Sequence, residues 1–69
     1  MNADMLKGKI RGMGLTQEAV AVKIGVSLSR FNAKINGTNG AEFSLGEVQT
    51  LKKILSLDME EVDRIFFAA

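Results

Sequence analysis

Positively charged side chains are concentrated in the first part of the sequence, where they could bind a polyanion. Residues 1–40 contain six basic residues against two acidic ones, a charge of +4, whereas residues 41–69 contain three against six, a charge of −3. The basic residues of the first part are Lys7, Lys9, Arg11, Lys23, Arg30 and Lys34. This asymmetry favours a protein in which only the first part meets phosphate groups. The alternative is a mixed, solvated surface.

Enzyme chemistry has little support in the residue types. The sequence contains no His and no Cys, which excludes zinc fingers, histidine general bases and cysteine nucleophiles. Gly8, Gly12 and Gly14 are not followed by the Lys-Ser/Thr pair of a phosphate-binding loop. The carboxylates fall mainly at expected helix starts and on expected exposed faces of the helices. We therefore expect no catalytic residues, no metal and no cofactor.

Helix starts are marked by a pattern that occurs four times. A Ser, Thr or Asp that can cap a helix follows an apolar residue, and a second apolar residue stands four positions after the cap. The sets are Leu15-Thr16 with Val20, Val26-Ser27 with Phe31, Phe43-Ser44 with Val48, and Leu57-Asp58 with Val62. Glu47 and Glu61 complete capping boxes at the last two.

These starts predict an all-α fold. Gly25 and Gly37 mark two helix ends, and apolar residues recur at helical spacing, as in the stripe Leu45, Val48, Leu51 and Leu55. We expect helices near 4–11, 17–24, 28–36, 45–55 and 59–66, with a turn at Thr38–Gly40. The expected architecture is a compact five-helix bundle in a single domain, residues 1–69.

Chain length favours self-association. A 69-residue domain has a small core, which rarely supplies more than roughly 3–5 kcal/mol, and this sequence has no Cys to add a disulfide. No apolar run is long enough for a membrane span or a signal peptide. We therefore expect a cytoplasmic protein that forms a dimer and does not enter a membrane.

Residues 16–37 predict two short helices joined by a tight turn, with the helix-turn-helix arrangement. The stretch TQEAVAVKIGVS, residues 16–27, resembles the TQEELAEKLGVS signature of Cro/repressor-type helix-turn-helix proteins. The matching residues are Gln17, Ala21, Gly25, Val26 and Ser27. The following FNAKING, Glu42-Phe43-Ser44 and Glu47-Val48 resemble a subgroup of small phage-encoded regulators with KLNG and EF(S/T)xxE(I/V) elements. The resemblance covers about residues 5–66.

This resemblance implies a lambda-repressor-like DNA-binding domain whose third helix lies in the major groove. Carried onto this sequence, the candidate base-reading residues are Leu28, Ser29, Arg30, Asn32 and Ala33. Arg30 can pair bidentately with guanine, whereas Leu28 and Ala33 can only touch a thymine methyl. The candidate phosphate-binding residues are Gln17, Ser27, Lys34, Asn36, Thr38 and Asn39, and Lys7, Lys9 and Arg11 would add longer-range attraction.

The C-terminal end offers a candidate partner surface. Ile65, Phe66 and Phe67 are consecutive, and adjacent aromatic side chains of a helix point in different directions. One of them is therefore expected to be exposed and to form a dimer or partner surface. Closure over the domain's own core is the alternative.

Together these patterns predict a Cro-like phage or prophage transcriptional regulator that acts in the cytoplasm on nucleoid DNA. It would bind double-stranded operator DNA as a homodimer through residues 28–36. The alternative is a phage antirepressor or modulator that binds a repressor protein rather than DNA, because Leu28 and Ala33 suit a protein groove better than a base edge.

Overall fold

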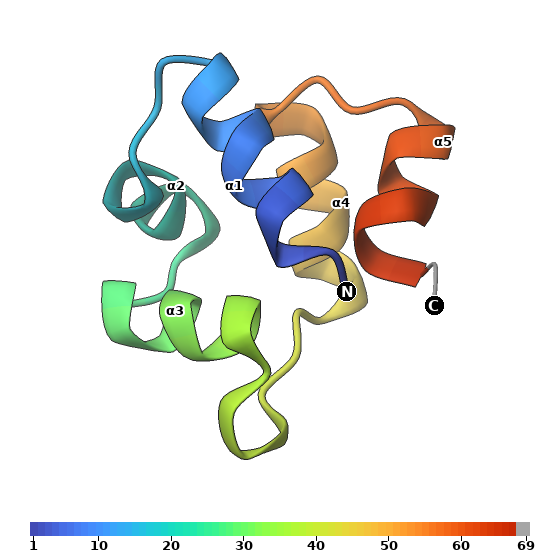
Figure 1. Ribbon diagram of the computed structural model, residues 1–69. Helices are drawn as coiled ribbons and strands as arrows, with labels where there is room; N and C mark the ends of the chain where they lie inside the picture. Colours follow the sequence, from blue (N-terminus) through green and yellow to red (C-terminus); the bar gives the residue numbers. More distant parts are fainter. Residues whose placement is uncertain (68–69) are drawn as a thin grey trace.

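The computed structural model describes residues 1–67, and in that range it contains helices and no strands (Figure 1). The α-helices are α1 (Ala3–Gly12), α2 (Gln17–Ile24), α3 (Leu28–Asn36), α4 (Leu45–Ile54) and α5 (Met59–Val62). A 3₁₀ turn (Thr38–Gly40) follows α3, and a π-helical turn (Asp63–Phe67) continues α5. The prediction of an all-α bundle is confirmed, with helix bounds close to those expected.

The caps explain where these helices begin. Thr16, Ser27, Ser44 and Asp58 each accept a hydrogen bond from a backbone N–H three residues later. Glu47 and Glu61 complete the capping boxes of α4 and α5. Sequence reasoning missed the cap of α1, where the Asn2 side chain accepts from the Met5 N–H at 3.0 Å. Each cap satisfies a backbone donor that has no partner within the helix.

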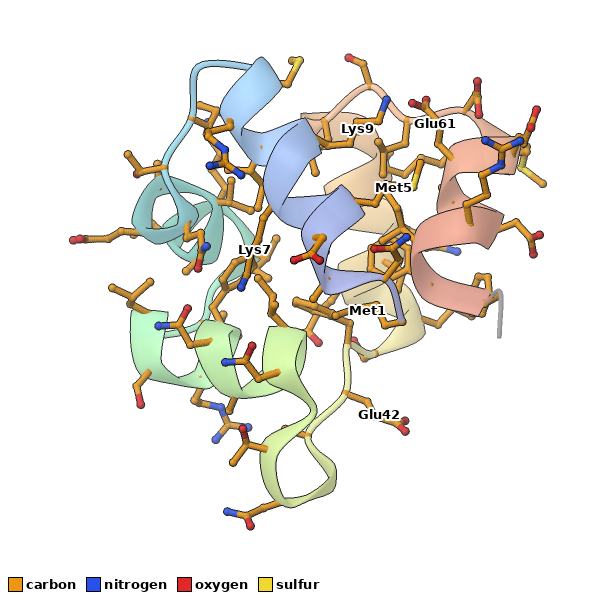
Figure 2. The ribbon with its side chains drawn as sticks, viewed as in Figure 1. Met1, Met5, Lys7, Lys9, Glu42 and Glu61 are labelled. Carbon is orange, nitrogen blue, oxygen red and sulfur yellow. The ribbon has the colours of Figure 1, made fainter. Side chains whose placement is uncertain are left out.

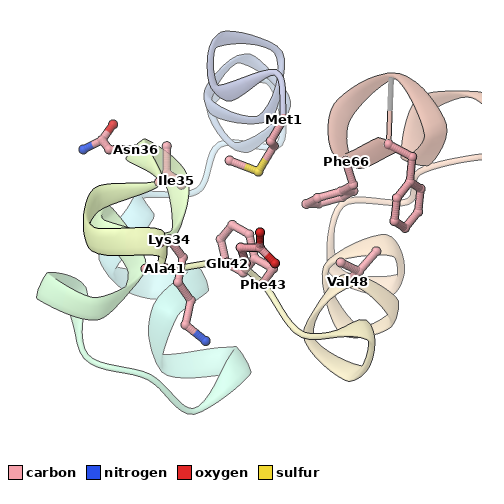
Figure 3. A pocket seen from close by; sticks show the side chains of 12 residues that line it. Met1, Lys34, Ile35, Asn36, Ala41, Glu42, Phe43, Val48 and Phe66 are labelled. Carbon is pink, nitrogen blue, oxygen red and sulfur yellow. The ribbon is translucent and has the colours of Figure 1, made fainter. Parts of the chain in front are cut away.

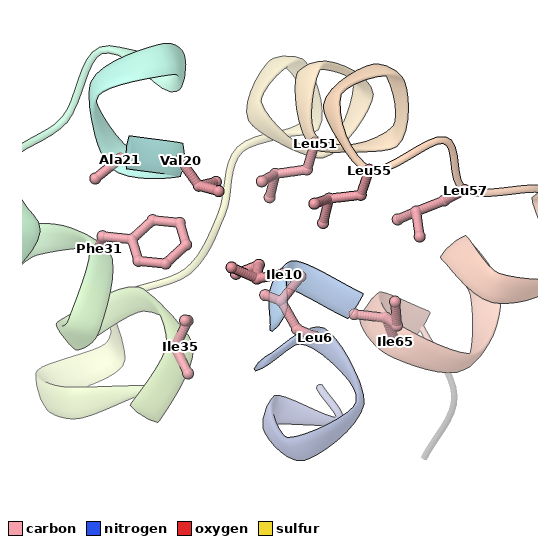
Figure 4. Close-up of a cluster of buried hydrophobic side chains, with 10 residues drawn as sticks. All are labelled: Leu6, Ile10, Val20, Ala21, Phe31, Ile35, Leu51, Leu55, Leu57 and Ile65. Atoms are coloured by element: carbon pink, nitrogen blue, oxygen red, sulfur yellow. The ribbon is translucent and has the colours of Figure 1, made fainter. Parts of the chain in front are cut away.

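The core contains residues from every part of the bundle (Figure 4). Leu6, Val20, Phe31, Leu51 and Ile65 have no exposed surface. Around them pack Ile10, Ala21, Ile35, Leu55 and Leu57. Burial of this apolar surface is the main term that holds the helices together.

Leu45 was expected in the buried stripe of α4, and this prediction was wrong because 67% of its surface is exposed. With 3.6 residues per turn, Leu45 is rotated about 90° from the centre of the face formed by Val48, Leu51 and Leu55. Those three residues are buried, as expected.

The first and last described segments of the chain are held together by a hydrogen bond and an ion pair. The Asn2 N–H donates a hydrogen bond to the carbonyl oxygen of Ile65 at 2.7 Å. Lys9 of α1 forms an ion pair with Glu61 of α5, which Figure 2 shows between these helices. The C-terminal turn is thereby held against α1. Within the part of the chain that is described, no helix has the length and apolar character needed to span a membrane.

Candidate nucleic-acid interface

The connection between α2 and α3 consists of Gly25, Val26 and Ser27. Gly25 has a left-handed backbone conformation (φ +80°), which a residue with a side chain rarely adopts. The Val26 N–H then donates to the Ala21 carbonyl oxygen at 3.0 Å and closes the end of α2. Ala21 itself is buried. The chain therefore changes direction at Gly25 and does not continue as one long helix.

Helix α3 has an apolar inner face and a polar outer face. Phe31 and Ile35 are one turn apart and are buried in the core. At about 100° per residue, Ser29 and Asn36 lie on the opposite side of the helix, with Arg30 and Asn32 flanking them. All four of these polar side chains are exposed.

The candidate base-reading residues are spread around the solvent-facing side of α3, with Arg30 and Asn32 on opposite flanks of Ser29. Ser29, Arg30 and Asn32 are exposed, Leu28 is 39% exposed, and Ala33 is half-buried. Among residues 1–67, Arg30 has no carboxylate within ion-pair distance. The N–H donors of its guanidinium can therefore bind a molecule outside the chain.

Most of the candidate phosphate-binding residues lie at the two ends of α3. Asn36, Thr38 and Asn39 are exposed near its C-terminal end, and Ser27 caps its N-terminal end. The Ser27 hydroxyl accepts a hydrogen bond from the Arg30 backbone N–H at 3.2 Å. Gln17 is half-buried at the first position of α2.

Lys34 differs from the other candidates because its ammonium group is already paired. It lies 2.6 and 2.7 Å from the two carboxylate oxygens of Glu47, and the Lys34 side chain is only 12% exposed. Partial burial alone would raise the pKa of Glu47, but hydrogen bonds from Lys34 and Ser44, together with the Lys34 charge, lower that pKa below its usual value. In this arrangement Lys34 does not reach out to a phosphate.

The basic residues of α1 point in different directions. Figure 2 shows the Lys7 side chain leaving α1 on the side of α2 and α3, whereas Lys9 points towards Glu61. Glu61 has a lowered pKa because Lys9 and the Asp58 backbone N–H donate to its carboxylate. Lys7 can therefore add positive potential beside α3, whereas Lys9 helps to hold α5.

The three candidate partner residues at the C-terminal end differ in their exposure to solvent. Ile65 was expected on the partner surface, but this prediction was wrong because Ile65 is fully buried in the core. Phe66 is half-buried and packs edge-to-face on Phe43, with ring centroids 6.0 Å apart. Phe67 is 62% exposed. Of the three side chains, Phe67 is thus the most available to a partner.

A hollow of about 450 Å³ lies beside these phenylalanines (Figure 3). Its walls come from the end of α3, the segment 40–43, Val48 of α4 and the C-terminal turn. Phe43 and Phe66 form its apolar side, and Lys34 and Glu42 contribute its polar side. Among the described residues, no cluster of three or more acidic side chains could hold a metal ion.

Comparison with known proteins finds no matching family model, curated protein or solved structure.

Proposed function

We propose that this protein is a small transcriptional regulator that binds double-stranded DNA by placing α3 in the major groove. The observation that carries this proposal is the outer face of α3, where Ser29, Arg30 and Asn32 are exposed while Phe31 and Ile35 anchor the helix in the core. A major groove about 12 Å wide admits one α-helix. The anchored helix supplies a rigid support for the polar side chains that would meet base edges.

Arg30 is the residue that we expect to discriminate most strongly between bases. A guanidinium can donate to both O6 and N7 of guanine, which is worth about 1–3 kcal/mol of discrimination. Ser29 and Asn32 can donate to or accept from neighbouring base edges. Leu28 can contact a thymine methyl group, because part of its side chain is exposed at the start of α3.

Contacts to the DNA backbone would flank this helix. Asn36, Thr38 and Asn39 are exposed around its C-terminal end, and Gln17 begins the neighbouring helix α2. Polar side chains and the free N–H groups of a helix start are common phosphate ligands. Lys7 would add attraction from the side of α1.

Two copies would bind one operator. A recognition helix reads one half-site, and a symmetric dimer reads two half-sites about 34–36 Å apart. The backbone of one copy extends over 27 × 27 × 21 Å, which is less than the spacing between two half-sites. The exposed Phe67 is the side chain that we assign to the surface between copies. Such a protein would act in the cytoplasm, on nucleoid DNA.

A second function is favoured by one observation, the exposure of Val22 and Leu28. Val22 of α2 is 72% exposed and Leu28 of α3 is 39% exposed, and no hydrogen bond to a base can come from either. Exposed apolar side chains of this kind suit a protein surface. The second candidate is therefore a modulator that binds a repressor protein through the exposed surfaces of α2 and α3.

An electrophoretic mobility shift series tests the proposal. The probes are duplex fragments that tile the promoter region next to the protein's own gene, each measured from low to physiological salt. We expect one fragment to shift at low salt and its affinity to fall steeply as salt increases, because phosphate contacts release counterions. If no fragment shifts at low salt while the protein forms a stable complex with a neighbouring repressor in size-exclusion chromatography, the second candidate replaces the first.

A further inference from the structure

Lys34 and Glu47 form a pair that is largely shielded from solvent. Their side chains are only 12% and 16% exposed, and both carboxylate oxygens lie within hydrogen-bond distance of the ammonium. The Lys34 Nζ also lies 6.0 Å from the centroid of the Phe43 ring. Shielding weakens the competition from water and salt that makes most surface ion pairs weak.

Glu47 is held in place by more than Lys34. Its carboxylate accepts the Ser44 N–H at 2.8 Å, and its own N–H donates to the Ser44 hydroxyl at 3.2 Å. This capping box fixes Glu47 on the first turn of α4. The capping box therefore holds the carboxylate beside α3 independently of its contact with Lys34.

The pair lies next to the base-reading surface. Lys34 is four residues after Arg30, so both side chains leave α3 on the same side, about one turn apart. An unpaired lysine at that position would extend the positive surface of Arg30 along the helix. Glu47 cancels this charge without reducing the hydrogen-bonding groups of Ser29 and Asn32.

We propose that Glu47 withholds Lys34 from the DNA backbone and thereby acts as a positioning residue that favours base recognition over general attraction to DNA. This inference rests on the proposed DNA-binding function and concerns the same surface. Phosphate contacts strengthen binding to all sequences alike, whereas base contacts distinguish among them. Pairing Lys34 internally lowers the first contribution and leaves the second unchanged.

The test uses the full chain and measures its affinity for a random-sequence duplex across a range of salt concentrations. The variants are Glu47→Gln, Lys34→Gln and the double variant, which has the same net charge as the parent. We expect Glu47→Gln to steepen the plot of log affinity against log salt by about 0.9, since one freed lysine gains one phosphate contact. The double variant should return to the parent slope.

Glu42→Gln is the matched control. Glu42 is exposed and, among residues 1–67, has no ion-pair partner, so its removal changes the net charge by the same amount without freeing a lysine. We expect its slope to remain that of the parent. Thermal unfolding followed by circular dichroism establishes that each variant is folded at the temperature of the binding measurement.

Several results would overturn the inference. A double variant with a slope shallower than the parent by about 0.9 would mean that Lys34 already contacts a phosphate in the parent. An unchanged slope for Glu47→Gln, or an equal change for Glu42→Gln, would mean that Glu47 does not mask Lys34. In these cases the parent still binds DNA and the proposed function stands. If neither the parent nor any variant binds duplex DNA at low salt, the proposed function and this inference both fail.

Discussion

The Ser27 hydroxyl accepts a hydrogen bond from the backbone N–H of Arg30, with 3.2 Å between the two heavy atoms. The residue that caps α3 is thus bonded directly to the residue that we expect to read guanine. Because this bond belongs to the first turn of α3, the position of Arg30 depends on the cap.

Loss of this cap should lower stability. We expect Ser27→Ala to reduce the free energy of unfolding by about 1 kcal/mol, measured by urea denaturation. Ser27→Asp restores a capping oxygen and should recover most of that loss. The aspartate should nevertheless weaken DNA binding, because it would add a negative charge beside the phosphate that we expect Ser27 to contact. Equal DNA affinity for the alanine and aspartate variants would contradict the placement of Ser27 at the interface.

Arg30→Ala should change specificity rather than stability. The side chain is exposed and unpaired within residues 1–67, so we expect a change of less than about 0.5 kcal/mol in the free energy of unfolding. Preference for guanine at one operator position should fall by about 1–3 kcal/mol, measured by competition among single-base operator variants. Lys53→Ala removes an equal charge from an exposed position of α4 and should leave that preference intact.

Phe67→Ala tests the surface between copies. Because Phe67 is 62% exposed, its truncation should leave the folded monomer intact while it weakens the proposed dimer. Sedimentation equilibrium should show a shift towards the monomer mass. Ile65→Ala is the contrasting variant, since removing a fully buried side chain should cost about 2–5 kcal/mol of unfolding free energy. An unchanged dimer fraction in Phe67→Ala would place the interface elsewhere.

Acid should destabilise the protein through Glu47. The pKa of this carboxyl in the folded chain is below its ordinary value of 4.5, so the folded state favours the ionised form. Its contribution to stability is therefore fully present above pH 4.5 and is lost as the pH falls below 4.5 through the folded-state pKa. Urea unfolding at a series of acidic pH values should show a smaller loss for Glu47→Gln than for the parent in this range.

Two glycines should respond to alanine in opposite ways. Gly8 lies inside α1, and a Cβ there would meet nothing within 4 Å, so Gly8→Ala should stabilise the protein by about 1 kcal/mol. Gly25 has equal space but a φ of +80°, so Gly25→Ala should destabilise it by about 1–2 kcal/mol. Thermal melts of both variants measure the difference. Destabilisation by both would indicate that Gly8 has a packing role.

The helices were predictable from the sequence because their starts depend on local chemistry. Thr16, Ser27, Ser44 and Asp58 bond to backbone groups only three residues away, and neighbouring apolar residues mark the same positions. Helical spacing also accounts for the exposure of Ser29 and Arg30, since Phe31 and Ile35 lie one turn apart and form the inner face of α3. Local hydrogen bonds and helical periodicity thus determine most of the candidate surface.

Features that depend on tertiary packing were less predictable. Lys34 and Glu47 belong to different helices, and their pairing depends on the path of the chain between α3 and α4. The sequence pattern around Glu47 predicts only its role in the capping box of α4. In the structure the same carboxylate also forms the ion pair with Lys34. The burial of Ile65 likewise depends on how the C-terminal turn packs against α1, which spacing within one helix does not reveal.

The hydrogen bond from Asn2 to Ile65 places the start of α1 beside the C-terminal π-helical turn. Two segments at opposite ends of the described sequence are therefore neighbours in the fold. A short linker between residues 67 and 2 could therefore close the described part of the chain, and a new opening at the exposed Gly14 would leave α2, α3 and the turn between them uninterrupted. In such a circular permutant α2 would be the first helix of the chain and α1 the last, with the same core between them.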